Sequence, residues 1–385
     1  MPDANVKDFG ATGDGKTDDT KSIQEALNYV AGRTRPSVLG PVPPNAPTQL
    51  VWSRLNLFLS RDVLERRYQK RHGRELGAAK AKEILAHIEQ GREYFLSADT
   101  AGALVRPLLQ YYGVLALSRA VVLVREPSVR ETALAPAHGL QSTLNGANDL
   151  EDLRLTITNG TFAELVRATG NVEEIPVFWP PIPQRRSLAS PLHVPTVGSS
   201  FPFADLLARL PALASLFEES LARRAHCHAT WTFILSLETH TELHILPGAF
   251  GLIEIDALHK LFPSLRGLEV HRRESHNFLG PTPHLAVRLP HRTIAELQGL
   301  LPPLLASSSA LPYLVEPYAG GWSLSTIASL FAGAFALSTL VRFHPTHWAR
   351  LINHEKGDRL LPVLDRLQAV IQEEVPRLVL AELER

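Results

Sequence analysis

Apolar residues recur at three- and four-residue spacings from residue 51 onward, and this period predicts amphipathic helices. The first such stretch is WSRLNLFLSRDVLERRYQKR (52–71), and the second is AAKAKEILAHIEQGREYFLSADTA (78–101). The third, VRPLLQYYGVLALSRAVVLVRE (105–126), is apolar nearly all round, which predicts a helix at the centre of the fold. Pro107 suits the first turn of that helix, where its missing N–H is not needed.

The pattern changes to alternation in the middle of the chain, as expected for strands whose successive side chains face opposite sides. Strands are predicted at residues 152–158, 228–237, 242–246, 266–271 and 284–289. Asn159-Gly160 predicts a turn after the first of these strands. A proline-rich stretch at 176–202 is interpreted as an ordered loop or as a crossing between domains.

Helical spacing surrounds and follows this segment. Helices are predicted at residues 203–221, with an interruption at Pro211, and at 324–343, 346–352 and 361–382. No internal repeat runs through the chain. The pattern therefore predicts an α+β fold that is dominated by helix, with a mixed middle segment and no complete β-helix.

The N-terminal part is expected to form a separate short module. Its strand is predicted at 6–11 and its helix at 19–30, before the proline-dense stretch RTRPSVLGPVPPNAPTQ. The predicted organisation is a strand–helix module at 1–33, a proline-rich linker at 34–50, a helical domain at 51–150, a mixed segment at 151–315 and a C-terminal helical region at 316–385.

Charge and cysteine content limit the partners of the chain. Lysine plus arginine and aspartate plus glutamate number 39 each, so no net field attracts nucleic acid or an anionic membrane. Cys227 is the single cysteine, which excludes an intramolecular disulfide and a cysteine-based zinc site. The start, MPDANVKDF, lacks the basic and apolar runs of a secretory signal. The uncharged stretch 324–341 is rich in Ser, Thr, Gly and Ala, which favours a buried core helix over a membrane span. We therefore expect a cytoplasmic protein without a membrane partner.

A phosphate-binding loop is matched in form at Gly10-Ala-Thr-Gly-Asp-Gly-Lys-Thr17. The preceding strand carries Lys7 and Asp8, whereas such a strand is normally buried and apolar. Asp14, Asp18 and Asp19 place negative charge where a polyanion would sit. We therefore expect no nucleotide at this loop and no cofactor.

The whole string NVKDFGATGDGKTDDTKSIQEALNYV (5–30) resembles the opening module of the pectate-lyase-like right-handed β-helix proteins. In that family a strand and a helix cover the open end of a long parallel coil, whose exposed edge would otherwise promote aggregation. The family's catalytic residues lie on later rungs, and no later residue of this chain matches them. The resemblance implies a carbohydrate-active enzyme as one alternative, which requires parallel β-rungs.

A second resemblance covers about 330 residues from position 51 onward. It is seen in REYFLSAD, RPLLQYYGVLALSRA, HGL, DLRLTITNGTFAELVRATG, FADLLARLPAL, YLVEPYAGG and FALSTLVRFHPTHWARLI, in this order. In these strings the chain is similar to the YaaC-like proteins, a bacterial group of unknown biochemical role. The resemblance implies no substrate, cofactor or catalytic residue.

The strings REYF and YYGVLALSRA also resemble the HEPN helical fold. This resemblance implies a ribonuclease with an R-x4–6-H motif, in which the histidine is the general acid or base and the arginine stabilises the phosphorane charge. The spacing occurs six times here: Arg66 and Arg67 with His72, Arg186 with His193, Arg223 with His228, Arg266 with His271, and Arg342 with His347. Arg342 and His347 follow a predicted helix and are the candidate catalytic pair, although Pro345 and Trp348 also suit a packed junction between helices.

His226 and His228 are two apart in a predicted strand, so their imidazoles lie on one face. Zinc takes three or four ligands, and His240 and His244 could complete such a site. Ordinary structural histidines explain the same pattern, so no metal is expected.

Three functions stay open at this point. The leading expectation is an interaction or regulatory protein, whose partner is another protein or a second copy of the chain. The alternatives are a HEPN-type ribonuclease in stress or phage defence, with RNA as the partner, and the carbohydrate-active enzyme.

Overall fold

The computed structural model describes residues 47–144, 153–179, 184–236, 240–248, 251–277, 280–306 and 312–385. The chain divides into two compact units, residues 1–43 and 44–385, and every described residue belongs to the second. The predicted N-terminal module, with the phosphate-loop match, lies outside the described residues. The domain boundaries predicted within the second unit stay predictions.

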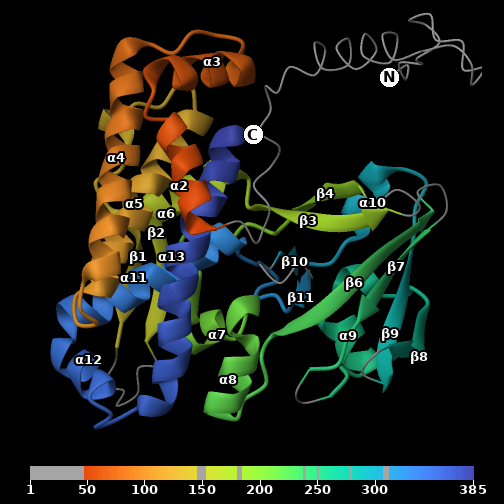
Figure 1. Cartoon of the computed structure of the whole chain (residues 1–385). Coiled ribbons are helices and arrows are strands. Elements are labelled where there is room, and N and C mark those ends of the chain that lie inside the picture. The colour runs from red at the N-terminus through yellow and green to blue at the C-terminus, as the bar shows by residue number, and fades with distance from the viewer. Residues whose placement is uncertain are drawn as a thin grey trace, which may run out of the picture. The chain divides into compact units, whose positions relative to one another are not determined.

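Helix exceeds strand in the described residues, which confirms the α+β prediction. The helices are α2 (Thr48–Leu57), α3 (Arg61–His72), α4 (Ala78–Thr100), α5 (Arg106–Arg125), α6 (Thr161–Thr169), α7 (Phe203–Leu207), α8 (Ala214–Leu221), α9 (Ile255–Leu261), α10 (Ile294–Leu300), α11 (Thr326–Phe343), α12 (Pro345–Ile352) and α13 (Leu361–Glu384). Figure 1 shows that α2–α6 and α11–α13 gather on one side of this unit and that the large sheet lies on the other. The predicted interruption at Pro211 is confirmed, because a 3-10 turn at Pro211–Leu213 separates α7 from α8.

The strands form two sheets. They are β1 (His138–Thr143), β2 (Arg154–Gly160), β3 (Val172–Trp179), β4 (Gln184–Pro191), β5 (Ser200–Pro202), β6 (Cys227–Ser236), β7 (His240–Ile245), β8 (Val270–Asn277), β9 (Gly280–Pro290), β10 (Leu304–Leu305) and β11 (Tyr313–Val315). The small sheet has the order β1-β2-β5, and the large one β10-β11-β6-β7-β9-β8 with the β3–β4 pair attached to β6. Neighbours are antiparallel except for β3 and β6, so the described residues contain no β-helix. The carbohydrate-active alternative therefore lacks its required rungs in this part of the chain.

The bundle is centred on α5, as its all-round apolar pattern predicts. Two glycines lie where α4 and α5 meet. Gly91 of α4 is so near Leu117 of α5 that a Cβ on the glycine would come within 2.6 Å of the leucine Cγ. A Cβ on Gly113 would come within 2.7 Å of the Phe95 ring. The two helices can therefore approach closely only because both positions lack a side chain.

Side chains of α3 and α4 satisfy the carbonyls at the C-terminal end of α5 and just beyond it. His72 bonds to the Val124 carbonyl at 2.8 Å, and Lys80 donates to the Glu126 and Pro127 carbonyls at 2.6 and 3.0 Å. The last carbonyls of a helix have no partner within the helix, and the positive charge of Lys80 there is favoured by the helix dipole. Helices α3 and α4 are fixed to the end of α5 in this way.

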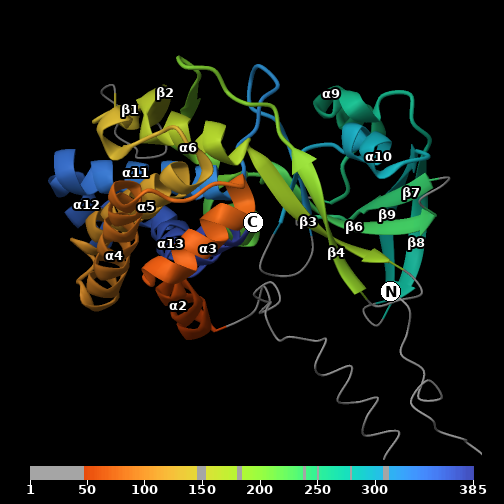
Figure 2. The same cartoon turned by 90° about the horizontal axis from the view of Figure 1, so that it is seen from above.

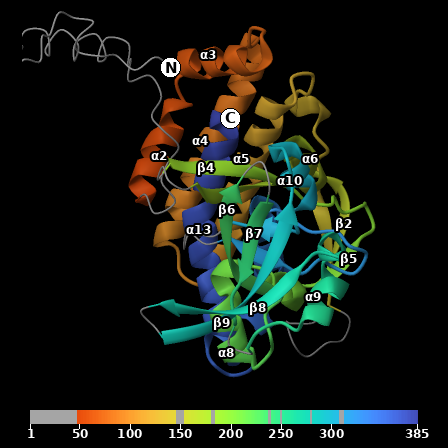
Figure 3. The ribbon, with the colours of Figure 1, turned by 90° about the vertical axis from the view of Figure 1, so that its right-hand side faces the viewer.

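The core of the large sheet lies on one face. Leu243 and Ile245 of β7 and Val287 of β9 are fully buried and belong to a cluster with Leu258 of α9 and Leu297 of α10. Figure 2 shows α9 and α10 over this face, and Figure 3 shows the strands of the sheet from a third direction. The alternation in β7 between buried and half-buried residues matches the pattern that predicts this strand.

Helix α11 begins at a buried polar junction with the sheet. The fully buried carboxylate of Glu173 accepts hydrogen bonds from the amide and the hydroxyl of Thr326, at 2.9 and 2.8 Å. Asn171 accepts from the Ser325 amide and donates to the Ser323 carbonyl, both at 2.9 Å. Both side chains replace the missing intrahelical partners of the first turn.

Two sequence predictions are wrong in this region. Most of the proline-rich stretch 176–202 is strand and not a loop, because β3 and β4 pair along their whole length. Proline is tolerated in strands at an edge, and within the described strands β4 pairs with β3 alone. The strand predicted at 266–271 begins later, at Val270, because a 3-10 turn at Pro263–Leu265 precedes it.

Candidate functional site

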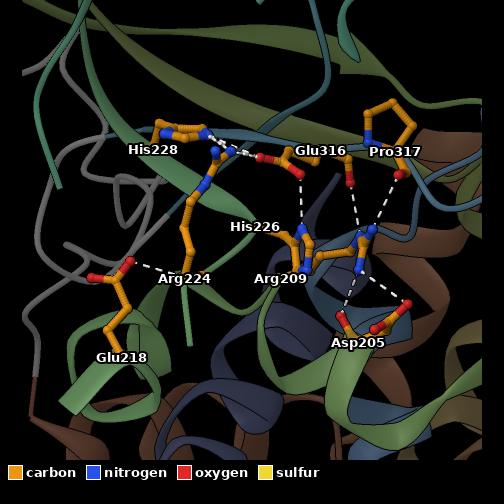
Figure 4. A network of polar contacts seen from close by, with 9 residues as sticks. Asp205, Arg209, Glu218, Arg224, His226, His228, Glu316 and Pro317 are labelled. Atoms are coloured by element: carbon orange, nitrogen blue, oxygen red, sulfur yellow. Dashed lines mark hydrogen bonds and ion pairs between the residues drawn. The ribbon is translucent and has the colours of Figure 1, made fainter. Parts of the chain in front are cut away.

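Three basic side chains surround the buried carboxylate of Glu316, just after β11 (Figure 4). His226 donates to its Oε2 at 2.7 Å, and His228 donates to its Oε1 at 3.2 Å. Arg224 also donates to Oε1. The same two segments are also joined through the main chain, because the Glu316 amide donates to the His226 carbonyl at 2.9 Å.

The charge on Glu316 depends on these neighbours. Burial alone would raise the pKa of this carboxyl, but the hydrogen bonds from His226 and His228 and the charge of Arg224 outweigh burial. The pKa of Glu316 is therefore held well below its usual range, and the side chain is an anion at neutral pH. A carboxylate that is already saturated by three donors is better suited to holding elements together than to proton transfer.

Arg209, which follows α7, binds the other side of the same segment. Its guanidinium donates to the carbonyls of Glu316 and Pro317 at 2.8 and 3.1 Å, and to the carbonyl of Asp205 at 2.9 Å. It also lies 4.2 Å from the ring centre of Tyr318. The Glu316 network therefore connects the short helices α7 and α8 to strands β6 and β11.

The network accounts for the histidine pair that suggested a metal. His226 and His228 do share a face, as predicted, but both are bonded to Glu316. His244 stacks on His284 with ring centres 5.0 Å apart and bonds to Glu242, so it belongs to a different group. No set of three possible ligands converges in the part of the chain that the structure describes.

Arg342 and His347 have different surroundings. Arg342, at the end of α11, donates to the carbonyl and the hydroxyl of Ser338, both at 3.3 Å. Its guanidinium lies 5.5 Å from the ring centre of Tyr111 and 5.0 Å from that of Phe343. His347, on α12, makes an edge contact with His344 at 6.1 Å between ring centres. The catalytic assignment of the pair stays a prediction.

The partner that the structure places near Arg342 is a histidine from a distant segment, His138 at the start of β1. The Tyr111 hydroxyl lies 2.5 Å from His138 Nδ1, and the two rings are in edge contact. Phe335 of α11 packs on both rings, with centres 5.7 Å from Tyr111 and 5.9 Å from His138. We call Tyr111, Arg119, His138 and Arg342 the Tyr111 cluster.

Two glycines hold His138 in place. Gly139 and Gly160 have φ angles of +82° and +141°, and a Cβ on Gly160 would lie 2.4 Å from the Gly139 nitrogen. The backbones of β1 and β2 can cross this closely only with glycine at both positions. The predicted turn at Asn159-Gly160 is wrong, because Gly160 ends β2 and leads directly into α6.

Arg119 is the second cation of the cluster. Its Nε donates to the Thr161 hydroxyl at 3.3 Å. Burial, and then the charges of Arg342 and Arg119, lower the pKa of His138, while burial raises the pKa of Tyr111. Within the described ranges, neither guanidinium has a carboxylate as an ion-pair partner.

The chemistry of the cluster follows from these charges. Both His138 and Tyr111 are neutral at pH 7, and a phenol O–H is the natural donor to the more basic imidazole nitrogen. With Nδ1 accepting from Tyr111, the proton of His138 is on Nε2, which has no hydrogen-bond partner among the described residues. The cluster therefore presents an N–H donor and two guanidinium groups, which is a set of donors suited to an anion.

Tyr111 and His138 were missed as site residues by the sequence reasoning. Tyr111 falls in an apolar helix where an aromatic residue is normally core, and His138 has no charged neighbour at a motif spacing. The only available signal was indirect. RPLLQYYGVLALSRA contains Tyr111 and Arg119, HGL contains His138, and FALSTLVRFHPTHWARLI contains Arg342. The TNGTF part of the long string contains Thr161, which contacts Arg119.

The described fold and site define an α+β protein in which a helical bundle and a branched, mostly antiparallel sheet are joined around Glu316. The bundle carries a basic cluster that has no carboxylate partner among the described residues. The chain belongs to the YaaC-like protein family, whose family model matches residues 57–383. A second, short match at residues 4–39 is to the pectate lyase-like rhamnogalacturonase A/epimerase family, and these residues lie outside the described structure. No curated protein and no solved structure matches the chain.

Proposed function

We propose that this protein is an interaction or regulatory protein that binds an anionic group at the Tyr111 cluster. The observation that carries the proposal is the pair of half-buried guanidinium groups, Arg119 and Arg342, beside a neutral imidazole. Elsewhere in the described chain, Arg54 pairs with Glu384 and Arg224 with Glu316. A half-buried cation without such a partner gains most from a bound anion.

Inorganic phosphate is the simplest probe of this proposal. Titration calorimetry should detect phosphate binding to the full chain and a loss of at least about tenfold in affinity for Arg342→Gln, since a charge-assisted hydrogen bond contributes about 1.5–3 kcal/mol. Arg119→Gln should behave in the same way. Arg272→Gln is the matched control, because Arg272 is an exposed arginine on β8 that pairs with Glu254. Equal affinities in all four proteins, or no phosphate binding at all, would contradict the proposal.

Phosphodiester cleavage at the same cluster is the second candidate, and one observation favours it. Arg342 and His138 both contact Tyr111, and the charge of Arg342 acts on His138, so an arginine and a neutral histidine share one cluster, with His138 in the role expected for His347. In this case Nδ1–H of His138 donates to the Tyr111 oxygen, and Nε2 accepts the proton of a ribose 2′-hydroxyl. Cleavage of a fluorescent RNA that is abolished by His138→Asn but retained by His347→Asn would support this candidate over binding alone.

The location of the protein is also a proposal. Helices α5 and α11 are long and apolar enough to cross a membrane, but most of each is buried within the chain. This burial supports the cytoplasmic location expected from the sequence. Fractionation of cells that express the protein should place it in the soluble fraction without detergent.

A further inference from the structure

We propose that the ligand of the Tyr111 cluster is a nucleotide, with its phosphate on Arg119, His138 and Arg342 and its base against the ring of Tyr112. This inference rests on the proposed anion binding and adds the chemical class of the ligand. The inference depends on two tyrosines, Tyr94 and Tyr112, that have no part in the proposed anion binding.

An aromatic pair adjoins the basic cluster. Tyr112 of α5 and Tyr94 of α4 are stacked, with ring centres 5.5 Å apart and planes 29° from parallel. Both side chains are half-buried, so part of each is accessible. The ring of Tyr112 lies 5.6 Å from that of Tyr111, whose other neighbours are His138 and Arg342. Tyr111 therefore connects the donors to the aromatic pair.

Helix periodicity places Tyr112, which would contact the base, and Arg119, which would contact the phosphate, on one face of α5. Leu108, Tyr112, Leu115 and Arg119 recur at spacings of four, three and four, and all four are half-buried while the positions between them are mostly buried. Tyr112 and Arg119 are two turns apart, which is about 10 Å along the axis. A long, flexible arginine side chain can shorten this separation, so one nucleotide can contact both residues.

The chemistry of this face of α5 discriminates between anions. Sulfate or inorganic phosphate can use the guanidinium groups but not the tyrosines. A base stacked on an aromatic side chain contributes about 1–3 kcal/mol, and stacking tolerates any base because each has a π-face. The geometry therefore predicts a nucleotide preference over inorganic phosphate of roughly five- to 150-fold, with weak discrimination among bases.

Calorimetry with adenosine 5′-monophosphate, inorganic phosphate and adenosine distinguishes nucleotide binding from anion binding alone. Adenosine 5′-monophosphate should bind the wild-type chain more tightly than inorganic phosphate by the factor given above, and adenosine without phosphate should bind weakly. Tyr112→Leu should reduce the affinity for the nucleotide to that for phosphate, while leaving phosphate binding unchanged. Arg342→Gln should weaken both.

Tyr112→Trp tests the same point without removing the aromatic ring, in case the leucine variant does not fold. It should retain the nucleotide preference. Equal affinity of the wild type for phosphate and nucleotide would overturn the nucleotide inference and leave anion binding in place. Absence of phosphate binding, with no effect of Arg342→Gln on any probe, would overturn both.

A mononucleotide and an RNA strand present the same phosphate and base, so the source of the ligand needs its own comparison. A single-stranded RNA of 12 nucleotides that binds more tightly than the mononucleotide, and loses that affinity in Tyr112→Leu, assigns the site to RNA. If the RNA and the mononucleotide bind with equal affinity per site, the site is assigned to a free nucleotide. An RNA affinity that Tyr112→Leu and Arg342→Gln leave unchanged would place RNA elsewhere on the chain and contradict the inference for that source.

Discussion

The hydroxyl of Tyr111 lies 2.5 Å from Nδ1 of His138, and this contact joins the second turn of helix α5 to the first residue of strand β1. Because burial keeps Tyr111 protonated and keeps His138 neutral, the direction of this hydrogen bond decides which nitrogen of His138 carries the proton. Anion binding requires the proton of His138 on Nε2, whereas base catalysis requires it on Nδ1, so that Nε2 is free to accept a proton.

Tyr111→Phe should change the protonation pattern of His138. With the hydroxyl removed, Nδ1 loses its donor, so the tautomer with the proton on Nε2 loses its preference and phosphate affinity falls by about fivefold, the effect of one net hydrogen bond. Nitrogen chemical shifts of the His138 ring report the tautomer directly. Wild-type shifts that already show the proton on Nδ1 would favour the cleavage candidate instead.

Glu316→Gln should destabilise the second unit by about 3 kcal/mol, because Arg224, His226 and His228 lose a buried anion. The folded pKa of Glu316 is below its unfolded value, so its stabilising effect is present above the unfolded pKa and is lost as the pH falls further. Urea unfolding at pH 7 and pH 3 should therefore show a smaller difference between wild type and variant at pH 3. An unchanged difference would mean that the network does not depend on the charge of Glu316.

Glu173→Gln should act in the opposite direction. Burial raises the pKa of Glu173 to about 7, despite the hydrogen bonds from Thr326 and Ala306. The folded pKa exceeds the unfolded one, so wild-type stability falls as the pH rises through the interval between them, by up to about 3 kcal/mol. Unfolding measured from pH 4.5 to pH 8 should show the stability of the variant increasing relative to wild type. Parallel curves would contradict a folded pKa of Glu173 above its unfolded value.

Gly113→Ala should lower the free energy of unfolding by about 2 kcal/mol, since a Cβ would lie 2.7 Å from a carbon of the Phe95 ring. The better helix propensity of alanine offsets about 1 kcal/mol of the strain. Gly77→Ala is the control for adding a Cβ without a clash, because Gly77 precedes α4 and no atom lies within 4 Å of the added Cβ. A Gly113 variant as stable as the Gly77 variant would show that α4 and α5 can separate without cost.

Long periodic segments were predictable from the sequence because one helix face must be buried wherever the segment packs. Helices α5, α11 and α13 illustrate this, with bounds close to those read from the spacing. The β3–β4 pair was not predictable, because Pro176 and Pro191 argue against strands unless the strands are known to lie at an edge. That knowledge is a property of the assembled sheet.

The candidate site was even harder to predict from the sequence. The R-x4–6-H spacing brought attention to Arg342 but paired it with His347, which is close in sequence. In the structure Arg342 also lies against the ring of Tyr111, whose hydroxyl contacts a histidine about 200 positions earlier, and no spacing motif could indicate that residue. A motif spacing describes neighbours along one segment, whereas the cluster combines α5, β1 and α11, whose association depends on the packing of the whole bundle.

The bundle has a consequence for synthesis on the ribosome. Helix α5 is covered by α11 and α13, and Arg54 of α2 is paired with Glu384, 330 positions later. A chain that emerges with its N-terminus first therefore leaves part of the apolar surface of α5 exposed until α11 and α13 have left the exit tunnel. Folding of the second unit is thus expected to be completed only once α13 has emerged, and until then the uncovered face of α5 is open to chaperones.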